Sequence, residues 1–173
     1  MKTFIVIPTY NEEKTIRQVA TTLLQYYVDV VVVDDGSQDG TWQELEGLAV
    51  HRLRHVLNRG QGAALQTGFD YALAQNADII VTVDADGQHC VEDIASVIEP
   101  IRQGDADMVL GSRFLGRAEN ISWLRRAMLK TAVHMTRYLS GLRVSDMHNG
   151  LRALSRKAAA RIHLRRDRIT HTS

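Results

Sequence analysis

The chain has 173 residues, 45% of them apolar, and its 21 Lys and Arg side chains nearly balance 20 Asp and Glu side chains. It contains only 12 Gly, 2 Pro and one Cys, which excludes collagen-like, linker-rich and disulfide-stabilised architectures and predicts a single globular domain in a reducing compartment. The charges are unevenly distributed. Residues 1–112 hold seven basic and 17 acidic side chains, a net charge of −10, whereas residues 113–173 hold 14 and three, a net charge of +11.

No part of the sequence predicts insertion into a membrane. No stretch approaches the roughly 20 apolar residues that span a bilayer. The apolar segment near the start ends at Pro8, which is too short for the core of a signal peptide, about 7–15 residues. We therefore expect a cytoplasmic protein, with any membrane contact being peripheral and on the cytoplasmic face.

Short β-branched segments alternate with longer segments of helical periodicity, a pattern that predicts an α/β fold with crossover helices. The strands are short and lack strict polar alternation, so we expect them to be buried on both faces. The expected strands are Thr3–Ile7, Asp29–Val33, Leu53–Leu57, Ile79–Val83 and Met108–Leu110.

Amphipathic helices are expected between and after these strands. The clearest covers Glu12–Tyr27, where apolar side chains recur at helical spacing; Asn11 would cap it, with Glu12 and Glu13 in its first turn. A Gly at position 68 interrupts another expected helix at a cost of ~1 kcal/mol relative to Ala. The further helices are expected at Gly62–Ala74, along the apolar stripe Ile94–Ile101, at Trp123–Leu139 and from about Ser155, with an irregular segment at Val144–Gly150.

Carboxylates gather where the expected strands end, the edge at which open α/β sheets bind ligands. Asp84 and Asp86 follow the fourth strand, with Gln88 two residues further on. Carboxylate and amide oxygens of this kind suit Mg²⁺ or Mn²⁺ bridged to a diphosphate. A surface turn is the alternative, because Asp and Gly favour turns.

Two other loops carry candidate ligand contacts. Asp34 and Asp35 follow the second strand, where a carboxylate could accept hydrogen bonds from a nucleobase or a ribose, although a plain turn explains them as well. The segment Asn58–Ala64 is rich in small residues and opens a helix, so it could approach a phosphate or a nucleoside. It matches neither the dinucleotide-binding fingerprint nor the P-loop.

Together, several segments resemble family 2 glycosyltransferases of the GT-A fold, and within them the dolichol-phosphate mannosyltransferase-like branch, whose members move a sugar from a nucleotide diphosphate to a polyprenyl phosphate. The segments that carry the resemblance are Ile7–Glu12, Val33–Ser37, Asn58–Gly62, Asp84–His89, Gly111–Phe114 and Asp146–Arg152. The resemblance covers residues 3 to about 165. It implies a GT-A (Rossmann-like) α/β fold, a mostly parallel sheet flanked by helices in one domain, and a metal-dependent inverting glycosyltransferase.

The resemblance also assigns residues to roles. A nucleoside-diphosphate sugar, with uridine or guanosine as the base, would be the donor and polyprenyl phosphate the acceptor. The positions that match nucleotide contacts are Pro8, Tyr10, Glu12, Asp35, Arg59, Gly60 and Asp84. The positions that match the Mg²⁺ or Mn²⁺ motif are Asp84, Asp86 and Gln88. The catalytic set comprises Asp86, Arg113 and Arg126 near the donor diphosphate and acceptor phosphate, and Asp146 on the acceptor-side loop.

By the same resemblance, residues 1–112 form the half that binds nucleotide sugar and metal, and residues 113–173 the acceptor side. Family members usually continue through another helix and strand, so we expect a chain that is truncated at its C-terminal side. The acceptor motif of processive polysaccharide synthases is absent, which favours a single transfer. A phosphate acceptor needs no base; a hydroxyl acceptor would, with Asp146 as the candidate. His89 and His148 fall inside motif segments and are weaker candidates for a site role, whereas the other His residues are scattered without ligand spacing.

Three other functions are considered: transfer to a hydroxyl acceptor in cell-surface polysaccharide synthesis, nucleotidyl transfer, and nucleic-acid binding by the basic half. Pro8–Glu12 lacks the Gly-rich basic loop expected of a nucleotidyltransferase, and the acidic half argues against a nucleic-acid partner. In the terminal segment Lys157, Arg161 and Arg165 form a row of like charge, which favours contact with an anion; anionic lipid headgroups are one candidate.

Overall fold

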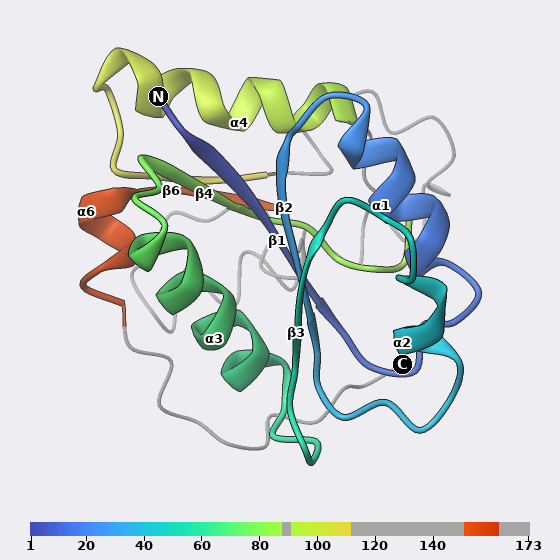
Figure 1. Cartoon of the computed structure of the whole chain (residues 1–173). Helices are drawn as coiled ribbons and strands as arrows, with labels where there is room; N and C mark the ends of the chain where they lie inside the picture. Colours follow the sequence, from blue (N-terminus) through green and yellow to red (C-terminus); the bar gives the residue numbers. More distant parts are fainter. Residues whose placement is uncertain (88–90, 112–150, 163–173) are drawn as a thin grey trace, which may run out of the picture.

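The computed structural model describes residues 1–87, 91–111 and 151–162. Six strands in these ranges form one sheet in the order β3-β2-β1-β4-β6-β5 (Figure 1). Five strands point the same way and β6 runs antiparallel between β4 and β5, so the expectation of a mostly parallel α/β sheet is confirmed. The strands are β1 (Thr3–Thr9), β2 (Asp29–Asp34), β3 (His51–Arg54), β4 (Ile79–Thr82), β5 (Met108–Leu110) and β6 (Arg152–Ser155).

Helices cover both faces of the sheet. Alternate β1 side chains point to opposite faces, which gives two apolar layers. Ile5 and Ile7 pack with α1 and α4, whereas Phe4 and Val6 pack with α3 and α6 (Figure 1). The helices are α1 (Ile16–Leu24), α2 (Thr41–Glu44), α3 (Gln61–Ala74), α4 (Val91–Gln103) and α6 (Arg156–Ala159). None of the described helices is long and apolar enough to cross a bilayer.

The start of the first helix differs from the expectation. α1 begins at Ile16, so Glu12 and Glu13 precede it. Asn11 is not its cap, because its φ of 56° is left-handed and its side chain accepts a hydrogen bond from the Gln38 N–H. The polar residues after β1 are thus tied to the loop after β2, which displaces the helix start by a full turn.

The third strand was also misplaced by sequence. It lies at 51–54 instead of 53–57, and Val56 and Leu57 are 97% and 73% exposed. β3 and β5 are edge strands with partly exposed side chains, so the expected burial on both faces holds for β1, β2 and β4 and is wrong for β3 and β5.

Two elements were not predicted. α2 is a single turn, and β6 is a four-residue strand whose Ala153 and Leu154 are buried. The terminal helix begins at Arg156, close to the expected start, and Ser155 caps it by accepting a hydrogen bond from the Ala158 N–H with its hydroxyl. The expected helix at 123–139 and the irregular segment at 144–150 lie outside the described residues.

Candidate active site

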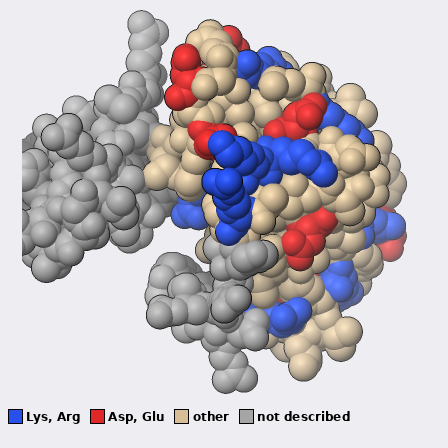
Figure 2. Space-filling view, turned by 90° about the vertical axis from the view of Figure 1, so that its left-hand side faces the viewer, with Lys and Arg blue, Asp and Glu red and all other residues tan. Residues whose placement is uncertain are grey.

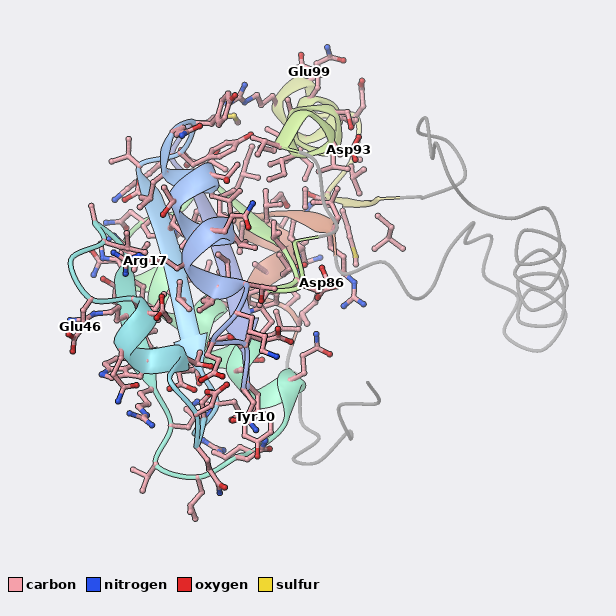
Figure 3. All side chains as sticks on the ribbon, turned by 90° about the vertical axis from the view of Figure 1, so that its right-hand side faces the viewer. Tyr10, Arg17, Glu46, Asp86, Asp93 and Glu99 are labelled. Atoms are coloured by element: carbon pink, nitrogen blue, oxygen red, sulfur yellow. The ribbon has the colours of Figure 1, made fainter. Side chains whose placement is uncertain are left out.

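Three loops with polar residues meet at one edge of the sheet. β1, β2 and β4 are adjacent and parallel, so their carboxyl ends lie side by side. Figure 3 shows Tyr10 and Asp86 on the loops that follow β1 and β4, whereas Arg17 and Glu46 lie toward the other side of the molecule. Side chains that are far apart in sequence can therefore act on one ligand here, as open α/β sheets generally allow.

Asp35 is the centre of the most extensive contacts at this edge. Its carboxylate accepts hydrogen bonds from the Arg59 N–H at 2.9 Å and from the Gly60 N–H at 2.7 Å. Its own N–H donates to the Thr9 carbonyl, which ties the loop to β1. Asp35, Arg59 and Gly60, all predicted as nucleotide contacts, are thus brought together in the structure.

Glycines allow these loops to approach each other. Gly36 has a φ of +75°, and a Cβ there would lie 2.8 Å from the Leu57 carbonyl carbon and 2.9 Å from the Asn58 nitrogen. Gly60, directly before α3, has a φ of +94°, a conformation that side chains rarely adopt. The small residues noted in the sequence at this point therefore serve the backbone conformation of the loop itself.

Asp34, by contrast, has a structural role. It is fully buried, its Oδ1 accepts from the Ser37 N–H at 2.8 Å, and its Oδ2 lies 3.1 Å from Arg54 Nε. Arg54 also donates to the Ser37 carbonyl, which closes the turn. The turn interpretation is correct for Asp34, whereas Asp35 organises a second loop.

The residues after β1 are held against the loop after β2. The Asn11 N–H donates to Ser37 Oγ at 2.9 Å and the Glu12 N–H donates to Thr41 Oγ1 at 2.7 Å. Asp39 supports the same turn. Burial raises the pKa of Asp39, but hydrogen bonds from the Thr41 hydroxyl, the Thr41 N–H and the Glu13 N–H outweigh it and hold the pKa below its ordinary value of 3.8. Pro8 is the second-last residue of β1 and Tyr10 directly follows the strand, so these predicted contacts reach the same edge.

The two carboxylates after β4 border a pocket of about 320 Å³. Asp84 is half-buried and receives a hydrogen bond from Gln61 Nε2 at 3.4 Å, whereas Asp86 is exposed (Figure 3). α1 contributes Gln18 and Thr22 to the lining, together with apolar side chains such as Val83 and Ile94. The carboxylates are therefore accessible to a ligand.

The donor set fits a hard divalent cation. Mg²⁺ is commonly held by one or two carboxylates together with substrate phosphates. Among the residues that the structure describes, no group of three His, Cys, Asp or Glu side chains could hold a metal. Asp84 and Asp86 offer two carboxylates, the number that such an ion commonly takes from a protein.

Several predicted residues lie outside the described ranges, so their places in the site stay predictions. They are Gln88, His89, Arg113, Arg126, Asp146 and His148.

Sequence reasoning missed His55 and Thr67. His55 Nδ1 lies 2.6 Å from Asp35 Oδ1, and its Nε2 lies 2.9 Å from Thr67 Oγ1. The signal was the strand register: Asp34 of β2 pairs with Arg54 of β3, which puts the next residues after the two strands side by side. That register was hidden because β3 was expected two residues too late.

The basic row of the terminal segment has an acidic partner within the chain. Lys157 Nζ lies 3.5 Å from Asp107 Oδ2, and both side chains are exposed. A hydrogen bond from the Ser155 hydroxyl, followed by the charge of Lys157, lowers the pKa of Asp107. Figure 2 shows basic side chains with acidic ones among them on the face that carries α6. Arg165 lies outside the described residues, and the lipid contact stays a prediction.

Comparisons with known proteins show the family of the chain. The sequence profile described as "Glycosyl transferase family 2" matches residues 4–162. The chain is similar to a UDP-N-acetylglucosamine–dolichyl-phosphate N-acetylglucosaminyltransferase of Methanococcus voltae, with 36% identity over 90% of this chain and 70% of the relative. It is also similar to a polyprenol monophosphomannose synthase of Mycolicibacterium smegmatis, with 34% identity over 94% of this chain and 65% of the relative.

A solved structure shares the fold. Glucosyl-3-phosphoglycerate synthase of Mycobacterium tuberculosis, in complex with Mn²⁺, UDP-glucose and phosphoglyceric acid, matches with a TM-score of 0.66 and 22% identity. The match covers 90% of this chain and 57% of that one. The chain thus spans between about half and three quarters of the length of the proteins it matches here.

Proposed function

Since the chain belongs to glycosyl transferase family 2 and is a glycosyltransferase, we propose that it transfers a sugar from a nucleoside-diphosphate sugar to a polyprenyl phosphate. The observation that carries the donor part is the convergence of the Asp35-bound loop and the Asp84–Asp86 carboxylates on one sheet edge. The acceptor part is supported by the names of the two relatives, both of which act on or make polyprenol phosphate compounds. Family membership argues against the nucleotidyltransferase and nucleic-acid alternatives.

The nucleoside would lie against the loops after β1, β2 and β3. Pro8 in β1 and Tyr10 and Glu12 after it would border the nucleoside on one side. Arg59 and Gly60, in the loop held by Asp35, would border it on another. Small residues at the start of α3 allow backbone approach to the ligand, and a helix N-terminus favours an anion.

Asp84 and Asp86, with Gln88, would hold Mg²⁺ or Mn²⁺ against the donor diphosphate. When bound, the ion offsets the charge that develops on the leaving nucleoside diphosphate. The chain therefore needs no acid to protonate that group. The remaining task of its residues is to orient the two substrates, which can lower the barrier substantially by itself.

The acceptor phosphate is already ionised, so it needs no general base. Arg113 and Arg126 would hold phosphate oxygens, a task suited to the planar guanidinium group. Asp146 would border the acceptor side, and would be the base only for a hydroxyl acceptor. Because a polyprenyl phosphate resides in a bilayer, the basic half of the chain would face an anionic membrane surface.

The donor proposal predicts a metal-dependent thermal shift. A panel of UDP- and GDP-sugars is added with Mn²⁺, with Mg²⁺ or with a chelator, and the Tm is measured. At about 100 times Kd the correct donor should stabilise the fold by about 2.7 kcal/mol, which for a chain of this size raises Tm by roughly 5–10 °C.

The shift should vanish with the chelator. Equal shifts with and without metal would contradict the metal assignment, and no shift with any donor would contradict the donor assignment.

A further inference from the structure

His55 lies buried between two polar side chains at the loop after β3. Its side chain is 9% exposed, and that of its partner Asp35 is 1% exposed. The ring joins Asp35 Oδ1, at 2.6 Å from Nδ1, to Thr67 Oγ1, at 2.9 Å from Nε2. Both ring nitrogens are therefore engaged within the chain.

The chemistry of the partners fixes the tautomer of the neutral ring. An ionised carboxylate only accepts hydrogen bonds, so Nδ1 carries the proton that is shared with Asp35. Nε2 is then an acceptor, and the Thr67 hydroxyl donates a hydrogen bond to it. Thr67 is part of α3, so the ring is anchored to a helix while it donates to Asp35.

The carboxylate that His55 contacts also sets the path of the following loop. Asp35 Oδ1 accepts from both His55 and the Arg59 N–H, and Oδ2 accepts from the Gly60 N–H. Rotation of this carboxylate would break hydrogen bonds to two consecutive amides. The direction of the Asp35 side chain therefore determines the backbone conformation from Arg59 to Gly60.

We propose that His55 is a positioning residue of the nucleotide site: its Nδ1–H fixes the Asp35 carboxylate, which in turn holds the Arg59–Gly60 backbone in the conformation that receives the nucleotide. The proposal rests on the proposed donor function, because nucleotide affinity is its functional readout. His55 acts through Asp35 and touches no substrate.

Two substitutions separate the two ends of the ring. In His55→Asn the side-chain amide nitrogen can take the place of Nδ1 and still donate to Asp35, while the link to Thr67 is lost. In His55→Gln the longer side chain reaches toward Thr67 and leaves Asp35 without this donor. Thr67→Val is the matched control, since it also removes only the distal link.

The Kd of the donor nucleotide, measured by calorimetry with Mn²⁺, should separate these variants. We expect His55→Gln to weaken binding by about tenfold or more, as for loss of a hydrogen bond to a charged group. The Kd of His55→Asn and of Thr67→Val should stay within about threefold of the wild-type Kd. In all three variants kcat should change less than KM. Equal weakening by Asn and Gln, or none by Gln, would overturn the proposal.

A second readout needs no nucleotide. Amide hydrogen exchange at Arg59 and Gly60 should be faster in His55→Gln than in His55→Asn, and equal exchange in the two would overturn the proposal. If the wild-type chain binds no nucleotide sugar, the donor function fails, while the exchange rates still decide the role of His55. If His55→Gln does not fold, NMR of wild-type His55 decides: a proton on Nδ1 supports the proposal, and a proton on Nε2 alone contradicts it.

Discussion

Replacement of Asp86 with Asn is expected to abolish the metal-dependent rise in Tm and to lower the rate of sugar transfer by about a hundredfold or more. The substitution keeps the shape of the side chain and removes its charge. Asp86 is exposed at the pocket after β4, where Asp84 supplies a second carboxylate. A metal ion at a leaving diphosphate contributes several kcal/mol to the transition state, and each 1.36 kcal/mol is tenfold in rate.

The matched control is Asp70→Asn. Asp70 is exposed on α3 and accepts a hydrogen bond from Gln66 Nε2 at 2.8 Å. The control therefore removes one negative charge at a position outside the strand-end loops. The control should keep both the thermal shift and the transfer rate. If both variants lose the thermal shift, the shift depends on the net charge of the protein and not on a metal ligand. If Asp86→Asn keeps the shift, Asp86 is not a metal ligand.

Gly68→Ala is expected to destabilise the protein by about 2 kcal/mol, although helix propensity alone favours Ala by ~1 kcal/mol. α3 packs closely on β1, and a Cβ at position 68 would lie 2.3 Å from Val6 Cγ1 and 3.4 Å from Val33 Cγ2. Both valines are fully buried, so neither can move away easily. Denaturant unfolding measures the change, which corresponds to a fall in Tm of about 4–8 °C for a chain of this size.

A double-mutant cycle identifies the cause. Val6→Ala removes the methyl groups that a Cβ at position 68 would meet. In that background Gly68→Ala should be nearly neutral. The same loss in both backgrounds, or a gain in stability on Gly68→Ala alone, would show that the close approach of α3 to β1 does not limit this position.

The pattern of apolar residues predicted the strands whose side chains are buried along their whole length. β1, β2 and β4 lie in the middle of the sheet and read as continuous apolar runs, so their positions were correct within two residues. β3 is an edge strand with one apolar residue, Leu53, whereas the apolar Val56 and Leu57 lie beyond the last paired residue and are exposed. β6 was missed because a four-residue strand containing Arg152 has no pattern that distinguishes it from a loop.

The site was predicted in its residue types but not in its contacts. Strand-end carboxylates are visible in sequence, and Asp35, Asp84 and Asp86 do lie at one sheet edge. The contact between Asp34 and Arg54 arises from the pairing of β2 with β3, which the sequence alone does not reveal. The same pairing brings His55 to Asp35, and a wrong strand boundary hid it.

The most direct test of the proposed activity is transfer of labelled sugar from the donor that shifts Tm. The full chain is incubated with Mn²⁺ and either polyprenyl phosphate or the corresponding polyprenol, and the label in the organic phase is counted. We predict metal-dependent transfer to polyprenyl phosphate alone, because only the ionised phosphate can attack without a general base. Equal transfer to the polyprenol, or no transfer to the phosphate, would contradict the proposal.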